Sequence, residues 1–168
     1  LKTITQLTSL PNTDVAIVSG RDKVFLEKWF GPLQLTLVAE HGYFVKEHKQ
    51  KWVANGSADN TWKKDILPIM EAFTDRTPGT FIEEKTNSLV WHYRKTDPEL
   101  AAERVVELKT VLASLISDKL SIMDMDKALE VVNSQITKGT AVSDLVSNKN
   151  YDFILCAGDD VTDEKMFT

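Results

Sequence analysis

Residues 152–164 read DFILCAGDDVTDE, an apolar run followed at once by an acidic loop. The apolar half has the pattern of a strand that is buried on both faces of a parallel sheet. A similar run, DVAIV at residues 14–18, precedes Ser19-Gly20-Arg21. Because ligands bind beyond the carboxyl ends of such strands, the two loops are the first candidates for a functional site.

The middle of the chain has a different pattern. Residues 80–85 and 88–93 read as an antiparallel hairpin, and Asp97-Pro98-Glu99 reads as a strong helix start. We therefore expect an α/β protein. Its parallel-sheet core comprises residues 1–35 and 131–168, and an α+β domain is inserted at 36–130.

Composition excludes several classes of protein. The chain has 168 residues, 42% of them hydrophobic, with a net charge of -5 and a pI near 5.2. This balance argues against a nucleic-acid partner, and no apolar run is long enough for a membrane span. The single cysteine, Cys156, and the lack of a signal-peptide pattern favour a reducing, cytoplasmic location. The chain opens inside a helical pattern and its end also stops in the middle of a pattern, so we expect part of a longer polypeptide.

The acidic loop is the best candidate for a metal site. Asp159, Asp160 and Asp163 are crowded carboxylates that repel one another unless a cation or hydrogen bonds compensate, and Mg²⁺ prefers hard oxygen ligands. An acidic helix start is the alternative. It explains Asp163 well but explains a doubled aspartate at a strand end poorly, so the pattern favours magnesium.

Two further groups could contact phosphate. The Ser19 hydroxyl, the Gly20 amide and the Arg21 guanidinium can all donate to phosphate oxygens. The alternative, a plain strand-to-helix turn, is favoured by these residues taken alone. Lys138 lies just before a helix and could offset the charge of a carboxylate and a phosphate; the alternative is an ordinary surface lysine.

These motifs, in this order, resemble the haloacid dehalogenase superfamily of phosphatases. The string Gly-Asp-Asp-x-Thr-Asp-Glu is more specific and is similar to that of the trehalose-6-phosphate phosphatases. The matching sequences look closest to those of the fungal enzymes. Further matches cover nearly the whole chain: Ala39-Glu40-His41-Gly42, Arg76-Thr77-Pro78-Gly79, Phe81-Ile82-Glu83-Glu84-Lys85, Trp91-His92-Tyr93-Arg94 and Leu129-Glu130-Val131.

The resemblance implies a Rossmann-like hydrolase core with a cap inserted in the middle. It implies hydrolysis of trehalose 6-phosphate to trehalose and inorganic phosphate through an aspartyl-phosphate, with Mg²⁺ as cofactor. Ser19, with Gly20 and Arg21, would hold the phosphate, and Lys138 would hold nucleophile and phosphate. Asp159 would bind Mg²⁺, with Asp160 and Asp163 in or near its ligand shell.

The resemblance also assigns residues of the inserted domain. Glu83, Lys85 and Glu130 would grip the hydroxyls of trehalose, whereas their patterns alone read as ordinary strand residues. His41 and Arg76 are further substrate-binding candidates carried over from matching strings.

Two departures from the family pattern matter. The opening motif Asp-x-Asp-Gly-Thr, which carries the nucleophile and the acid/base, is absent. The sequence Asp124-Met125-Asp126 is followed by Lys127-Ala128, and we interpret it as a solvated turn. Val132-Asn133 stands where many relatives carry Arg-Pro. Because the motif with the nucleophile and the acid/base is absent, we expect residues 1–168 alone to be inactive.

Three alternatives stay open. The chain could belong to a related sugar-phosphate phosphatase, to an inactive phosphatase-like domain that regulates a partnered trehalose synthase, or to a plain α/β domain with an acidic loop. A trehalose-6-phosphate synthase domain or subunit is the expected macromolecular partner.

Overall fold

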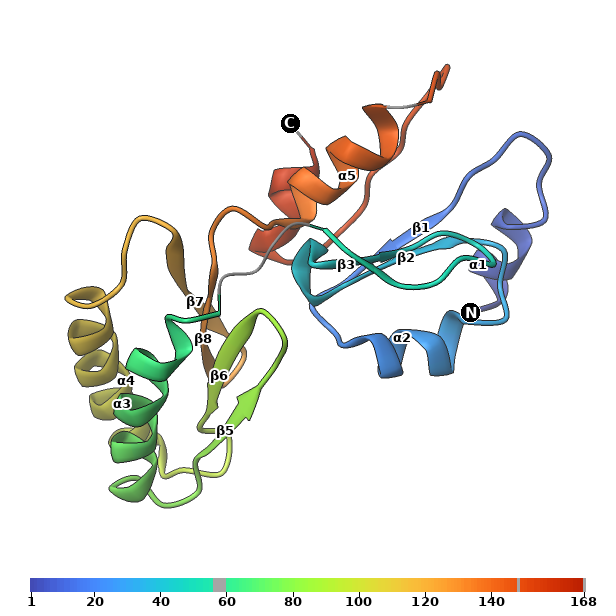
Figure 1. Cartoon of the computed structure of the whole chain (residues 1–168). Coiled ribbons are helices and arrows are strands. Elements are labelled where there is room, and N and C mark those ends of the chain that lie inside the picture. Colours follow the sequence, from blue (N-terminus) through green and yellow to red (C-terminus); the bar gives the residue numbers. More distant parts are fainter. Residues whose placement is uncertain (56–59, 148, 168) are drawn as a thin grey trace. The chain divides into compact units, whose positions relative to one another are not determined.

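The computed structural model describes residues 1–55, 60–147 and 149–167. The chain divides into two compact units. Leu1–Ser57 and Ile136–Thr168 form the first, here called the core unit, and Ala58–Gln135 forms the second, the insert unit (Figure 1). The insert unit is therefore one contiguous segment that interrupts the core unit.

The core unit contains a four-stranded sheet in the order β1-β2-β3-β4. Strand β1 is parallel to β2, with Ile17 beside Leu37, and the other two pairs are antiparallel. Between β1 and β2 the chain forms α2, since a parallel pair needs a crossover. The bounds are β1 (Ala16–Val18), α2 (Lys23–Phe30), β2 (Thr36–Ala39), β3 (Phe44–Lys46) and β4 (Val53–Ala54).

Helix α2 covers this sheet through an apolar contact. Its first turn is capped by Asp22, whose carboxylate accepts the Phe25 amide at 2.7 Å. Leu26 is 1% exposed and packs with Leu35 and Leu37. The remaining core elements are α1 (Lys2–Leu7), the short helix η1 (Glu40–Gly42), α5 (Lys138–Ser147) and the short helix η2 (Val161–Met166).

The expected boundary at residue 36 is wrong. Residues 36–55 carry β2, β3 and β4, which extend the sheet that begins with β1 and so belong to the core unit. At the other end, β8 (Ala128–Asn133) pairs as far as Asn133, so the insert unit continues past residue 130 to Gln135. Hydrogen bonding between strands, which a local pattern does not reveal, sets both boundaries.

Residues 152–157 do not form the expected buried strand. Phe153 and Leu155 are each 79% exposed, and none of residues 152–157 pairs with a described strand. In the described part of the chain β1 pairs only with β2. A cavity of about 420 Å³ lies between β1 and residues 153–157. A strand needs a neighbour for its N–H and C=O groups, and the described residues supply none at this position.

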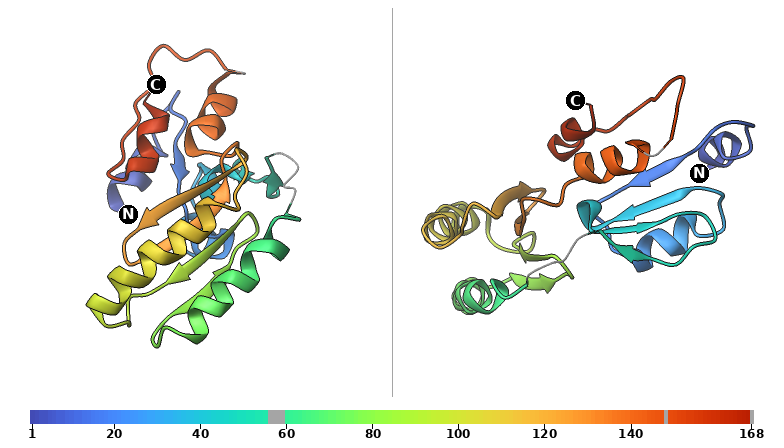
Figure 2. Two further views of the ribbon diagram at one scale, coloured as in Figure 1. Left: turned by 90° about the vertical axis from the view of Figure 1, so that its left-hand side faces the viewer. Right: turned by 45° about the horizontal axis from the view of Figure 1, so that its top comes forward.

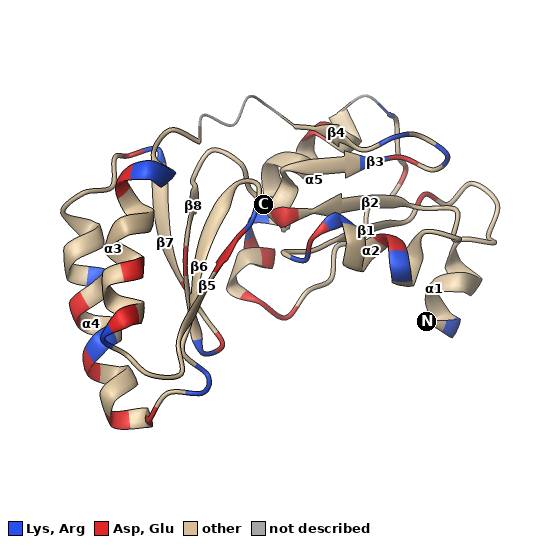
Figure 3. Cartoon of the chain, turned by 60° about the horizontal axis from the view of Figure 1, so that its bottom comes forward, with Lys and Arg blue, Asp and Glu red and all other residues tan. Residues whose placement is uncertain are grey.

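The insert unit is an antiparallel sheet with helices on one face (Figure 2). Leu89, Trp91, Leu129 and Val131 point to that face and pack against the helices. Acidic and basic residues are interspersed along both helices (Figure 3). The sheet order is β5-β6-β8-β7, with β5 (Phe81–Glu84), β6 (Ser88–His92), β7 (Leu120–Met125), α3 (Lys63–Asp75) and α4 (Pro98–Ala113).

The predicted α/β class, a parallel-sheet core interrupted by an α+β domain, is confirmed; in the described residues β1 and β2 form the parallel pair of the core. Asp97 caps α4 as expected and accepts the Glu99 and Leu100 amides at 3.1 Å each. No helix within the described ranges has the length and apolarity needed to cross a membrane.

Candidate functional site

The loop after β1 is tied to the loop after β2. The Ser19 amide donates to the Val38 carbonyl at 2.9 Å, and the Ser19 carbonyl accepts the His41 amide at 3.1 Å. The Ser19 Oγ accepts the Arg21 amide at 3.2 Å, which leaves the hydroxyl proton as a donor. The predicted phosphate-binding loop is therefore held in a fixed shape by its neighbour in the sheet.

His41 lies directly against Gly20. A Cβ on Gly20 would stand 2.4 Å from the His41 Nε2, so any larger residue would displace the imidazole. His41 has a left-handed backbone, with φ 57° and ψ 21°, and is 6% exposed. The structure thus brings two predicted site residues together. The Arg21 guanidinium lies 5.0 Å from the centre of the Phe25 ring.

Lys138 and Asp163 form a buried ion pair. The Lys138 Nζ lies 2.7 Å from the Asp163 Oδ1, and the two side chains are 5% and 8% exposed. The Asp163 Oδ2 accepts the backbone amides of Asp159 and Asp160 at 3.1 and 3.0 Å. Burial raises the pKa of the Asp163 carboxyl, but these bonds outweigh burial, so its pKa lies below the usual value.

The acidic loop fits a divalent cation in part. One ligand oxygen from each of Asp159, Asp160 and Asp163 lies within 4.8 Å of the others. Asp159 and Asp160 are exposed, whereas both oxygens of Asp163 are engaged by Lys138 and the loop amides. The donor set therefore suits a magnesium site with one or two carboxylate ligands, and Asp163 orients the loop that carries them.

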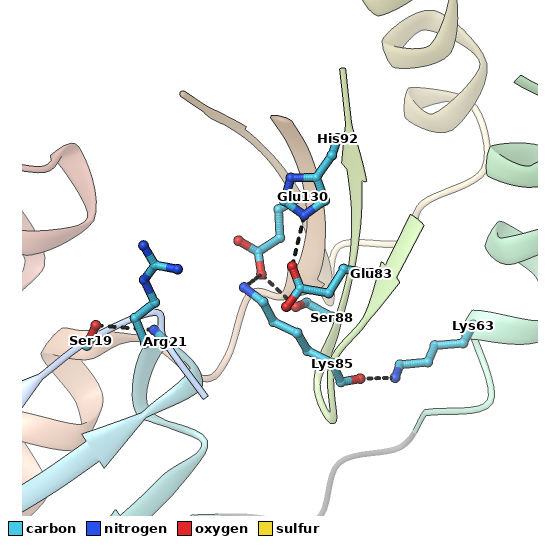
Figure 4. A network of polar contacts seen from close by, with 8 residues as sticks. All are labelled: Ser19, Arg21, Lys63, Glu83, Lys85, Ser88, His92 and Glu130. Carbon is cyan, nitrogen blue, oxygen red and sulfur yellow. Dashed lines mark hydrogen bonds and ion pairs between the residues drawn. The ribbon is translucent and has the colours of Figure 1, made fainter. Parts of the chain in front are cut away.

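Polar residues converge on Glu130 in the insert unit (Figure 4). Glu130 is 1% exposed, and its Oε1 accepts the Ser88 hydroxyl at 2.5 Å and faces the Lys85 Nζ at 3.4 Å. Nearby on the hairpin, the Glu83 Oε2 lies 2.8 Å from the His92 Nε2. The Phe81 ring stacks on the His92 ring at 4.5 Å.

The alternation of the strands explains this gathering. Successive residues of a strand point to opposite faces. Because Leu89, Trp91 and Leu129 face the helices, the face away from the helices receives Ser88, His92 and Glu130. The structure therefore groups all three predicted sugar-binding residues, Glu83, Lys85 and Glu130, on the helix-free face of one sheet.

Arg76 is not part of this group. It caps the C-terminal end of α3, where its Nε donates to the Ala72 carbonyl at 2.8 Å and its guanidinium lies 5.0 Å from the centre of the Phe73 ring. The other end of α3 is Lys63, about 20 Å away along the helix axis. Lys63 contacts the tip of the β5–β6 hairpin. In this structure the Arg76 side chain therefore contacts the last turn of α3.

Three residues of the polar group were not predicted: Lys63, Ser88 and His92. Ser88 and His92 lie two residues before and after Val90, which is the register partner of Glu130 on β8. The period-two pattern of β6 therefore places both on the same face as Glu130, once the pairing of the strands is known. Lys63 precedes the first apolar residue of α3, and nothing in its local sequence marks it. Asp124 and Asp126 lie at the β7–β8 turn in exposed ion pairs with Lys109 and Arg94, as the solvated-turn interpretation expects.

Comparison with known proteins gives consistent matches. The family model for trehalose-phosphatase matches residues 1–168. The chain is 42% identical to a bifunctional trehalose-6-phosphate synthase/phosphatase of Thermoproteus tenax over 99% of its own length and 23% of the relative's. It is also 42% identical to a trehalose-phosphatase of Schizosaccharomyces pombe, over 99% of its own length and 22% of the relative's. The chain thus spans about a fifth of these relatives.

A solved structure agrees. The C-terminal domain of the Candida albicans trehalose-6-phosphate phosphatase superposes with a TM-score of 0.90 and 35% identity, covering 99% of this chain and 62% of that one. The archaeal and fungal relatives are equally similar, so the expected fungal type stays a prediction. On the family model, the sequence identity and the fold together, the chain belongs to the trehalose-phosphatase family.

Proposed function

We propose that residues 1–168 supply the phosphate-, metal- and sugar-binding groups of a phosphatase that hydrolyses trehalose 6-phosphate to trehalose and inorganic phosphate. The observation that carries this proposal is the buried pair of Lys138 and Asp163 behind the acidic loop. A buried cation held at a carboxylate-rich loop suits a phosphoryl group and its counter-ion. Family membership supplies the substrate.

In the core unit each group would have a distinct task. Ser19, Gly20 and Arg21 would donate to phosphate oxygens, and Lys138 would offset their charge. Asp159, assisted by Asp160, would hold Mg²⁺, which when bound neutralises charge on the phosphate. Asp163 would keep Lys138 and the loop amides in place, as its bonds indicate.

In the insert unit, Glu83, Lys85 and Glu130 would hydrogen-bond to the hydroxyls of the sugar. Carboxylate and ammonium groups on a sheet face bind hydroxyls well, and a site built this way rejects analogues that lack them. We propose that this unit, taken as Ala58–Gln135 in place of residues 36–130, acts as the cap domain of the family. His41 would act through Gly20, and a contact between Arg76 and the substrate stays a prediction.

We propose that the nucleophile comes from outside residues 1–168, because no Asp-x-Asp-Gly-Thr string occurs within them. The exposed carboxylates of Asp124 and Asp126 are engaged by Lys109 and Arg94 at a hairpin turn of the insert unit. An Asp-x-Asp-Gly-Thr segment joined to this chain would supply one carboxylate to attack phosphorus, forming an aspartyl-phosphate, and a second to protonate the departing sugar oxygen.

The test is phosphate release from trehalose 6-phosphate by the polypeptide that carries Asp-x-Asp-Gly-Thr together with residues 1–168. We expect release with Mg²⁺, loss of release with a chelator, and none from residues 1–168 alone. A panel of glucose, mannose and sucrose phosphates is the control for substrate choice. Equal rates across the panel would reassign the chain to a general sugar-phosphate phosphatase, and no release from any substrate would refute the proposal.

A second candidate is an inactive domain that regulates a trehalose-6-phosphate synthase. The missing Asp-x-Asp-Gly-Thr motif in residues 1–168 favours it. The retained Lys138–Asp163 pair argues for activity. A change in synthase rate on adding a phosphatase-inactive polypeptide would identify the regulatory role.

We also propose a cytoplasmic location, because Cys156 is a free thiol.

A further inference from the structure

Lys63 is a buried cation without an assigned role. It is the first residue of α3 and only 8% exposed, which is unusual for lysine. An ammonium in such a place is costly unless it is hydrogen-bonded. Its Nζ donates to the Glu84 Oε1 at 3.2 Å. It also donates to the backbone carbonyl of Lys85, as Figure 4 shows. Both acceptors lie at the end of β5, so Lys63 joins the start of α3 to the tip of the hairpin.

That tip carries two of the groups that hold Glu130. The turn between β5 and β6 is closed by the Lys85 amide, which donates to the Ser88 carbonyl at 3.0 Å. From the two sides of this turn, the Lys85 Nζ and the Ser88 Oγ approach the same carboxylate oxygen, at 3.4 and 2.5 Å. A small shift of the turn would lengthen both contacts at once.

We propose that Lys63 is a positioning residue for sugar recognition. It fixes the backbone at Lys85, so that the Lys85 ammonium and the Ser88 hydroxyl hold Glu130 in the orientation that receives a sugar hydroxyl. The link runs from Lys63 through the Lys85 carbonyl to Glu130, and it lies within the insert unit. The sugar-binding part of this inference rests on the proposed function, whereas the holding of the turn does not.

The test compares Lys63→Met with Lys64→Met in the polypeptide that carries Asp-x-Asp-Gly-Thr. Lys64 is the exposed neighbour on the same helix turn and serves as the matched control. We expect Lys63→Met to raise KM for trehalose 6-phosphate about tenfold, the effect of losing one charge-assisted hydrogen bond, with kcat nearly unchanged. Hydrolysis of 4-nitrophenyl phosphate, which has no sugar, should be unchanged in both variants.

Hydrogen exchange gives a second readout that needs no activity. In the 168-residue chain, the amides of the turn between Lys85 and Ser88 should exchange faster in Lys63→Met than in Lys64→Met, while the amides of β8 keep their protection. If wild type hydrolyses 4-nitrophenyl phosphate but not trehalose 6-phosphate, the proposed substrate is wrong. The exchange rates then still decide whether Lys63 holds the turn.

The inference is overturned if Lys63→Met leaves KM for both substrates and the exchange of the turn unchanged. It is also overturned if both substrates are affected equally, since that is the signature of general destabilisation. If Lys63→Met does not fold, Lys63→Gln replaces it. Glutamine keeps a polar end but is too short to reach the Lys85 carbonyl, so the same selective rise in KM is expected, and its absence refutes the inference.

Discussion

Gly158 is the residue on which the geometry of the acidic loop most directly depends. A Cβ at this position would stand 2.4 Å from the Asp163 Cβ, Cγ and Oδ2. Glycine alone allows Asp163 to lie against the loop backbone, accept two amides and still reach Lys138. The glycine before the doubled aspartate is therefore required by packing around the ion pair.

We predict that Gly158→Ala lowers kcat/KM for every phosphate ester at least tenfold, because the added methyl displaces Asp163 and with it Lys138 and the loop. Steady-state kinetics on trehalose 6-phosphate and 4-nitrophenyl phosphate would measure the loss. Val161→Ala, at a residue that is 79% exposed, is the control and should behave as wild type. A loss confined to the sugar substrate would contradict this account.

Glu130 offers the complementary test on the sugar side. We predict that Glu130→Gln raises KM for trehalose 6-phosphate on the order of tenfold and leaves 4-nitrophenyl phosphate unaffected. The amide keeps the shape of the side chain but removes the charge that faces Lys85 at 3.4 Å. Glu107→Gln, which removes an exposed carboxylate on α4, serves as the control. Equal KM values in the two variants would remove Glu130 from the site.

For single residues, the sequence predicted which polar side chains are candidates for the site, but it did not predict which groups each side chain contacts. The metal-ligand role of Asp163 stays a prediction; the pattern of the loop did not reveal that its carboxylate also pairs with Lys138, 25 residues away along the chain. Arg76 was predicted to contact substrate because it lies in a matching string, and that role stays a prediction; its bond to the Ala72 carbonyl at the end of α3 was not foreseen. Ser88 and His92 needed the register of β6 against β5 and β8 before they could be seen.

Among the elements, α2 is secured to the sheet by one carboxylate. The Glu27 Oε1 accepts the Lys46 ammonium of β3 at 2.5 Å and the Trp52 Nε1 at 2.8 Å. The hydrogen bond from Lys46 is the main reason that the pKa of Glu27 lies below its ordinary value of 4.5. The bond therefore stabilises the packing of α2 while Glu27 is ionised.

We predict a pH-dependent contribution from Glu27. A lowered folded-state pKa means that the contribution is complete above pH 4.5 and is lost as the pH falls through the folded-state pKa. The Glu27 side chain is 37% exposed, so screening limits the effect to about 1 kcal/mol or less. Urea unfolding of wild type and Glu27→Gln at pH 7 and pH 3 would measure it. A gap between the two proteins that persists at pH 3 would contradict the assignment.

Elements whose signals are local were predicted, and those that need a distant partner were not. The start of α4 follows from Asp97-Pro98-Glu99, because the cap, the proline and the first-turn acid act within one turn. Residues 152–157 have the composition of a buried strand, but a strand forms only beside another strand. The described residues leave that side of β1 without one.

For the molecule as a whole, the division into units has a mechanical consequence. The strands β5–β8 and the helices α3 and α4, as far as the structure describes the insert unit, come from one segment, and their apolar side chains form one cluster. A segment of about 80 residues with its own core is within the size range that folds alone.

We predict that residues 58–135, expressed alone, fold in one cooperative transition. Circular dichroism and urea unfolding would show it, and Leu129→Ala should destabilise the fragment by about 2–5 kcal/mol because Leu129 is fully buried. Val106→Ala, at a residue that is 66% exposed, is the control. A gradual, non-cooperative transition in the fragment would show that the insert unit depends on the core unit.

The order of units along the chain, core then insert then core, was predicted from the change in pattern, and the exact boundaries were not. Residues 36–55 look like a hairpin in either unit, and only the parallel register of Ile17 beside Leu37 assigns them to the core. Such a pairing joins residues about twenty positions apart and leaves no mark in the local sequence.

Because the insert unit is a single uninterrupted segment, the part of the gene that encodes it can be exchanged by joining new DNA at only two points. One recombination event between related genes, with crossovers near codons 57 and 136, would exchange Glu83, Lys85, Glu130 and the Lys63 contact together. Ser19, Lys138 and Asp159, which we propose bind phosphate and Mg²⁺, lie in the core unit and would not be exchanged. On the proposed function, a lineage could thus acquire a new sugar preference in one step while keeping the residues that we propose bind phosphate.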